Sequence, residues 1–240
     1  MNLVSATVAW LTDPAQWTGP GDIPQRIAEH IGLSAISLLV AILIALPAGL
    51  AIGHTGRGSA FAATLANIGR AIPSLAVIAI VLPITAGIDP QLGFKVYPTL
   101  VAMVILAIPP ILLNAEAGIA GVDRDLVESA TAMGMRERQV LGSIEIPVAL
   151  PVILTGIRSG ATQIVATMTL GAIFGAGGLG RFLVEGIAQN DDGKIFGGVV
   201  LVAALALTTE GLFAILLRVC ESPGLRRPSG TRAASRSASG

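Results

Sequence analysis

Ionisable side chains inside long apolar stretches are the first candidates for chemistry in this sequence. Arg70, Arg158 and Glu210 each lie within about 20 residues that are otherwise uncharged. A charge at membrane depth is costly unless it is paired or faces water, so such residues often mark a path for ions or solutes. We expect these three side chains to face a polar path or a subunit interface. A packing role inside a helix bundle is the alternative.

Residues for enzyme chemistry are scarce. The only cysteine is Cys220, and the two histidines, His30 and His54, lie far apart. Neither a disulfide framework nor a metal cluster is predicted, and no phosphate loop of the G-x4-G-K-[ST] type is present. We therefore expect no metal, no cofactor and no catalytic residue in this chain. A membrane enzyme is the weakest alternative.

A glycine-rich stretch, Gly175–Gly180, literally satisfies G-x-G-x-x-G. A dinucleotide site requires this motif to follow a strand and to open a helix. Here it follows an apolar segment and leads into a loop. We interpret it as a tight bend where helices pack closely, and its glycines Gly177, Gly178 and Gly180 are candidates for a gate.

The segment 120–147 has the pattern of two short amphipathic helices. Asp123 can cap the first helix and Gly134 can close it. A second helix would expose Arg136–Arg138 and end at Pro147. The apolar edges of the two helices are formed by Leu126, Val127, Ala130, Met133, Val140, Leu141 and Ile144. Two such helices form a compact docking knob that suits a groove on another protein.

Within this docking knob, Glu128-Ser129-Ala130, Gly134 and Ile144-Glu145-Ile146-Pro147 resemble the E-A-A-x3-G-x9-I-x-L-P signature of ATP-binding-cassette (ABC) importer permeases. Ser129 and Ile146 depart from the signature by small changes in volume. In that family the signature helices dock onto a cytoplasmic ATPase subunit. The resemblance therefore implies that ATPase coupling rests on Glu128, Ser129, Ala130, Gly134, Ile144 and Pro147.

Three further stretches are similar to the permeases of importers for glycine betaine, choline and related osmoprotectants. They are Arg70–Ala76 (RAIPSLA), Ile108–Asn114 (IPPILLN) and Gly175–Gly180 (GAGGLG), of which the last also occurs in methionine-type permeases. The resemblance covers roughly residues 26–217. The candidates for the pathway or gate are Arg70, Pro73, Pro109, Pro110, Asn114, Gly177, Gly178, Gly180 and Glu210.

The resemblance implies an all-α type I ABC importer permease fold with five transmembrane helices, six being the alternative. It implies a permease for glycine betaine, choline, carnitine or proline betaine, and not an enzyme. Its partners would be cytoplasmic ATPase subunits, a second identical or related permease subunit and an extracytoplasmic binding protein. The alternatives are another small-nutrient importer, such as a methionine-type one, and a self-sufficient secondary transporter.

The elements that position these residues follow from composition. The chain is 53% hydrophobic and 12% charged, too few charges to wet a soluble globule, and its net charge of zero gives no indication of nucleic acid as a partner. Five segments reach the length needed to cross a bilayer, and they lack the alternation of strands, so helices are expected. They are Ile31–Gly53, Ala60–Ile88, Pro98–Ile119, Val148–Leu170 and Ile195–Leu217.

Basic residues predict the orientation in a bacterial cytoplasmic (inner) membrane. One set of loops and ends carries nine of them and the other set four. The positive-inside rule places the N-terminus outside and the C-terminus in the cytoplasm. The expected layout is an extracytoplasmic segment at 1–25, a transmembrane permease domain at 26–217 and a disordered basic cytoplasmic tail at 218–240.

Overall fold

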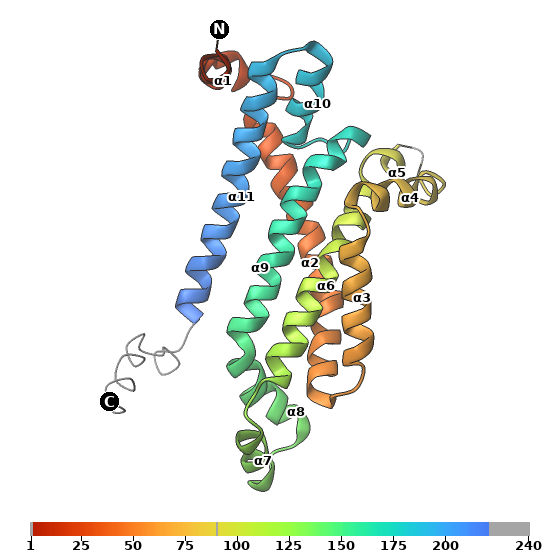
Figure 1. Cartoon of the computed structure of the whole chain (residues 1–240), viewed down its shortest axis with the longest axis vertical. Coiled ribbons are helices and arrows are strands. Elements are labelled where there is room, and N and C mark those ends of the chain that lie inside the picture. Colours follow the sequence, from red (N-terminus) through yellow and green to blue (C-terminus); the bar gives the residue numbers. More distant parts are fainter. Residues whose placement is uncertain (1, 90, 221–240) are drawn as a thin grey trace, which may run out of the picture.

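Four long helices form the body of the protein, and they run along its longest axis (Figure 1). The computed structural model describes residues 2–89 and 91–220. The long helices are α2 (Ile23–Thr55), α6 (Tyr97–Ala120), α9 (Ile146–Gly171) and α11 (Asp192–Cys220). Each is long and apolar enough to cross a membrane. The described residues contain no strand, which confirms the all-helical prediction.

The second expected span is broken into two helices, α3 (Ser59–Ala71) and α4 (Ser74–Ala86), which meet at an angle of 93°. The break follows from Pro73, because a proline lacks the N–H that a helix interior needs and disfavours the helical conformation of the residue before it. Ile72 is accordingly extended, with φ −83° and ψ 124°. Counted as one span, the bent pair makes five among the described residues, and these contain no sixth.

Shorter helices gather at the two ends of the bundle. Helices α1 (Leu3–Thr12), α5 (Leu92–Lys95) and α10 (Gly180–Gln189) lie at one end, and α7 (Arg124–Ala132) and α8 (Glu137–Val140) at the other (Figure 1). Helix α11 starts beside α10 and runs toward the end that carries α7. It continues to Cys220, past the predicted limit at Leu217; the remainder of the expected tail, 221–240, lies outside the described residues.

Helix α6 is the centre of the bundle, and small residues let its neighbours approach closely. A Cβ added at Gly49 of α2 would lie 2.6 Å from the carbonyl oxygen of Leu112. A Cβ added at Gly156 of α9 would lie 2.6 Å from the Cβ of Asn114. Glycine at such contacts allows the close van der Waals packing that holds membrane helices together. The same core buries Ala41, Ala45, Met103, Ala107, Ile164 and Met168.

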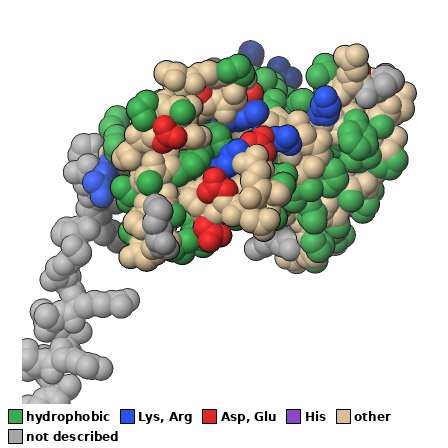
Figure 2. Space-filling model, turned by 90° about the horizontal axis from the view of Figure 1, so that it is seen from above, with side chains coloured by type: hydrophobic (Ala, Val, Ile, Leu, Met, Phe, Trp, Pro, Cys, Tyr) green, Lys and Arg blue, Asp and Glu red, His purple; other side chains and the backbone are tan. Residues whose placement is uncertain are grey.

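Acidic and basic side chains lie side by side at the end that carries α1 and α10 (Figure 2). The Glu185 carboxylate accepts hydrogen bonds from Arg181 Nε and Lys194 Nζ, each at 2.7 Å. Burial raises the pKa of Glu185, but hydrogen bonds from Lys194 and Arg181 and the charges of both outweigh it and hold this pKa below its ordinary value. The pair with Lys194 joins α10 to the start of α11, whereas the pair with Arg181 lies within α10.

Candidate functional site

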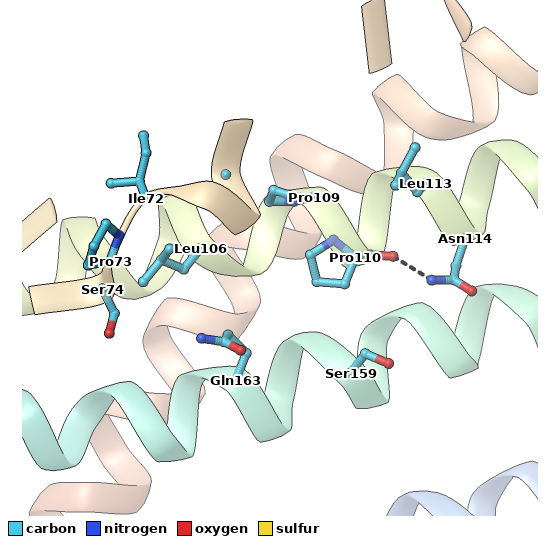
Figure 3. Close-up of a pocket in the computed structure, with 11 residues that line it drawn as sticks. Ile72, Pro73, Ser74, Leu106, Pro109, Pro110, Leu113, Asn114, Ser159 and Gln163 are labelled. Atoms are coloured by element: carbon cyan, nitrogen blue, oxygen red, sulfur yellow. Dashed lines mark hydrogen bonds between the residues drawn. The ribbon is translucent and has the colours of Figure 1, made fainter. Parts of the chain in front are cut away.

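A cavity of about 590 Å³ opens where the α3–α4 break faces α6 and α9 (Figure 3). Four residues predicted for the pathway line it together: Pro73, Pro109, Pro110 and Asn114. The remaining lining residues were not predicted, and they are Gly69, Ile72, Ser74, Leu106, Leu113, Ser159 and Gln163. Segments almost 100 residues apart in the sequence therefore meet at one hollow.

The shape of this cavity depends on the prolines of α6. Pro109 and Pro110 lack the N–H groups that would bond to carbonyls one turn earlier, which loosens the helix at this point. One turn later, Asn114 Nδ2 donates a hydrogen bond to the carbonyl oxygen of Pro110 at 2.8 Å (Figure 3). This bond holds the amide side chain against the helix at the cavity wall.

The lining of the cavity is polar but uncharged. Hydroxyl and amide groups come from Ser74, Asn114, Ser159 and Gln163, and in Figure 3 Ser159 and Gln163 project from α9 toward α6. Among the described residues that line it, none carries a charge or an aromatic ring. A quaternary ammonium group binds tightly over aromatic faces. The polar, uncharged lining of this cavity can therefore solvate a small polar solute without holding it strongly.

A second cavity of about 560 Å³ lies on the neighbouring side of α9 and shares Ser159 and Gln163 with the first. Its charged groups are Arg158 of α9 and Glu210 of α11, which form an ion pair although 52 residues separate them. The hydroxyl of Thr162 also donates to Glu210, at 3.3 Å. Two of the three ionisable residues singled out from the sequence are thus partners.

The glycine loop lies elsewhere, against the start of α2. Gly178 N donates to Glu29 Oε2 at 2.9 Å, and Leu179 N donates to His30 Nδ1 at 3.3 Å. Gly177 and Gly178 have φ of +84° and +70°, a left-handed conformation that favours glycine. Gly180 packs against the backbone of α9. These contacts make the tight bend that was predicted; a role in gating stays a prediction.

Arg70 is the remaining predicted pathway residue. Its backbone belongs to α3, next to Gly69 of the first cavity, and its side chain lies outside the described part of the structure.

The first half of the docking knob has the predicted form. Asp123 caps α7, its carboxylate accepting from Asp125 N at 2.9 Å. Gly134 follows the helix with φ +90°, and the next amide, Met135 N, bonds back to the carbonyl oxygen of Ala130 at 3.2 Å. Ala130 is buried, with a relative exposure of 2%. The two residues before it, Glu128 and Ser129, are exposed.

The second half differs from the prediction. Pro147 does not end a helix: it is the second residue of α9, directly after a π-helical turn, and such local adjustments of the helix accommodate the missing N–H of a proline. Helix α8 leads through a π-helical turn, Leu141–Glu145, directly into α9. The predicted coupling residue Ile144 lies half-buried in this turn. The docking knob is therefore continuous with a membrane-spanning helix.

A contact between a histidine and a glutamate, which the sequence analysis did not predict, joins the docking knob to α2. His54 Nδ1 and Glu145 Oε2 lie 2.6 Å apart, and Glu145 is only 5% exposed. A 320 Å³ cavity lies beside them, and Arg124 and Glu128 of α7 also line it. A glutamate between two isoleucines, Ile144 and Ile146, was the available signal, because a charged residue in an apolar context needs a partner.

A model of a known protein family matches most of this chain. The model described as "Binding-protein-dependent transport system inner membrane component" matches residues 33–226.

Curated relatives match along most of the chain. A choline transport system permease of Bacillus subtilis is 31% identical, with 88% of this chain and 94% of the relative aligned. A carnitine transport permease of Listeria monocytogenes is 34% identical, over 76% of this chain and 80% of the relative. An osmoprotectant import permease of Salmonella typhimurium is 30% identical, over 92% and 99%.

Solved structures share the fold. The methionine ABC transporter MetNI in an inward-facing conformation contains a chain that superposes with a TM-score of 0.74 at 21% identity, covering 88% of this chain and 100% of that one. An amino acid ABC transporter crystallised with histidines gives a TM-score of 0.59 at 19% identity, over 81% and 90%.

Proposed function

Because the chain belongs to the family of inner membrane components of binding-protein-dependent transport systems, we propose that it forms the translocation pathway of an importer for osmoprotectants such as glycine betaine, choline and carnitine. The fold is that of a type I ABC importer permease, and the chain is a multi-pass membrane protein. The permease component is not itself the ATPase of such a system.

The proposed substrate class is supported by the solutes for which the curated relatives are named. Permeases named for choline, for carnitine and for osmoprotectants align over 76–92% of this chain at 30–34% identity. The methionine transporter shares the fold at 21% identity, which supports architecture and not cargo. Osmoprotectant import is therefore the function that we propose.

The first cavity supports a pathway that binds its solute weakly. Its uncharged lining of Ser74, Asn114, Ser159 and Gln163 can replace part of the hydration of a small polar molecule. The prolines beside it loosen α6 and break the α3–α4 span, which suits helices that must change shape. Specificity would then rest mainly on an extracytoplasmic binding protein that delivers the solute.

The docking knob supports coupling to a separate ATPase. Glu128 and Ser129 are exposed on α7, and Leu126 and Met133 are 43% and 78% exposed. An exposed edge of apolar and acidic side chains is suited to a groove on a partner. The basic residues at this end of the bundle, Arg57, Arg124, Arg136, Arg138 and Arg218, favour a cytoplasmic location.

Reconstituted uptake tests the proposal. The chain is co-expressed with the ATPase and binding-protein subunits that co-purify with it, and the complex is placed in proteoliposomes. We expect uptake of glycine betaine, choline or carnitine that requires both ATP and the binding protein. Methionine serves as the comparison solute. Uptake of methionine with no osmoprotectant uptake would overturn the substrate class, and uptake by the chain alone without ATP would overturn the importer mechanism.

A further inference from the structure

Helix α9 carries a continuous polar face at membrane depth. Thr155, Arg158, Ser159, Thr162 and Gln163 recur at intervals of three and four residues, which places them on one side of the helix. Ser159 and Gln163 line both cavities, whereas Arg158 and Thr162 line only the second. The neutral cavity and the charged cavity are therefore two parts of one polar surface.

The ion pair on this surface is open to the second cavity. The side chains of Arg158 and Glu210 are 31% and 39% exposed, so neither is sealed between the helices. Apart from Ala166, the other lining residues supply hydroxyl and amide groups, from Thr155, Ser159, Thr162 and Gln163. The cavity thus offers one cationic and one anionic group to a solute that enters it.

The need to keep both charges neutralised determines which solute can bind between Arg158 and Glu210. An intramembrane charge without a partner is costly, so a solute that separates Arg158 from Glu210 must neutralise both. A betaine has one carboxylate and one quaternary ammonium group, and it can satisfy both residues at once. A simple cation would occupy Glu210 and leave the guanidinium of Arg158 unpaired.

We propose that Arg158 and Glu210 form a zwitterion-exchange site in the pathway. The guanidinium of Arg158 binds the carboxylate of the solute, because its fork of donors matches that group. Glu210 faces the quaternary ammonium, which has no N–H to donate and is held by charge alone. The proposal rests on the proposed function and adds to it a preference for zwitterionic over purely cationic osmoprotectants.

The alternative role for the pair is a fixed tether between α9 and α11. A tether would stabilise the assembly for every solute equally, because its two residues would never touch the cargo. The two roles therefore differ in substrate selectivity, and a loss of total activity does not separate them.

The experiment measures the uptake KM and kcat of glycine betaine and choline with the reconstituted complex. Arg158→Gln is expected to raise the KM for glycine betaine about tenfold relative to choline, the scale of a lost charged hydrogen bond. Glu210→Gln is expected to raise the KM for choline relative to that for glycine betaine, because it removes the only anionic group among the described residues that line the second cavity. Thr208→Ala is the matched control on α11, since the Thr208 hydroxyl bonds only to Ala204 O within its own helix.

The measurements on the Arg158 variant and on the Glu210 variant each have outcomes that would overturn the proposal. Equal changes for the two solutes, or no change for either, in assembled Arg158→Gln and Glu210→Gln complexes would contradict it. If these variants do not assemble, Arg158→Lys and Glu210→Asp keep both charges; Arg158→Lys is then expected to raise the KM for glycine betaine alone, and a parallel change would overturn the site. If only glycine betaine is carried, its KM must rise in Arg158→Gln while kcat is kept, and a fall in kcat alone would contradict the site.

The wild-type complex separates this proposal from the function on which it rests. A wild type that carries no osmoprotectant refutes the proposed function. A wild type that carries glycine betaine, with variants of unchanged selectivity, refutes the zwitterion site alone.

Discussion

Glu145 and His54 lie 91 residues apart in the sequence, yet Glu145 Oε2 and His54 Nδ1 are 2.6 Å apart at the base of the docking knob. Glu145 ends the π-helical turn before α9, and His54 lies in the last turn of α2. The contact joins α2, the first membrane span, to the junction between the docking knob and α9, the fourth span. The docking knob and α2 are therefore in direct polar contact through this pair.

Removal of the Glu145 acceptor is expected to destabilise the protein. Glu145→Ala leaves a cavity and an unpaired His54, at a cost of about 1–3 kcal/mol. Glu145→Gln keeps the size and one acceptor oxygen, so it should lose less than half as much. Thermal unfolding of the detergent-purified protein measures both. Equal stability of Glu145→Ala and wild type would show that the contact is not stabilising.

Gly134 tests the backbone of the docking knob. A Cβ there meets nothing within 4 Å, so the effect of Gly134→Ala comes only from its φ of +90°, with a strain of about 1–2 kcal/mol. We expect weaker association with the ATPase subunit. Gly142→Ala is the matched control, because Gly142 also has free space but no positive φ. Equal ATPase association of the two variants would contradict this role of Gly134.

Gly156 tests the contact between α6 and α9. A Cβ there would lie 2.6 Å from Asn114 Cβ and 2.8 Å from the carbonyl oxygen of Pro110. Gly156→Ala should push the helices apart beside the first cavity, with a cost of about 1–3 kcal/mol from overpacking. Gly211→Ala, where nothing lies within 4 Å, is the control. Unfolding temperatures of the two variants provide the measurement, and a Gly156→Ala protein as stable as its control would refute the close approach.

Glu185 predicts a pH dependence of stability. The pKa of Glu185 is lower in the folded protein than its ordinary value of 4.5, so its ion pairs stabilise the fold above that pH. This contribution is lost as the pH falls through the lower folded value. The stability difference between wild type and Glu185→Gln should therefore shrink below about pH 4. A difference that grows on acidification would have the wrong sign.

The spans and the docking knob were predictable because their signals are local. Hydropathy identified four long helices and the apolar segment 60–88, which was expected as one span, and the caps at Asp123 and Gly134 marked α7. The right-angled turn at Pro73 was not predicted, since a proline in an apolar run can kink a helix or break it. Pro147 was misassigned because a proline inside a continuing helix and a proline that terminates one can have the same local sequence.

The candidate site was predicted only in part. Pro73, Pro109, Pro110 and Asn114 came from motifs, and the structure brings them to one cavity. Ser159 and Gln163 were missed because helical periodicity specifies the face of α9 and not the neighbour that this face meets. The pairing of His54 with Glu145 was missed for the same reason, as was that of Arg158 with Glu210.

The docking knob is proposed to face the cytoplasm and to bind a separate ATPase, and a single cysteine tests both properties directly. Met133 is 78% exposed on the docking knob, so Met133→Cys in a Cys220→Ser background presents one accessible thiol. We predict that a membrane-impermeant maleimide labels it in inverted vesicles, not in intact cells, and that bound ATPase subunit protects it. Labelling of intact cells at the same rate, or no protection by the ATPase, would contradict the account.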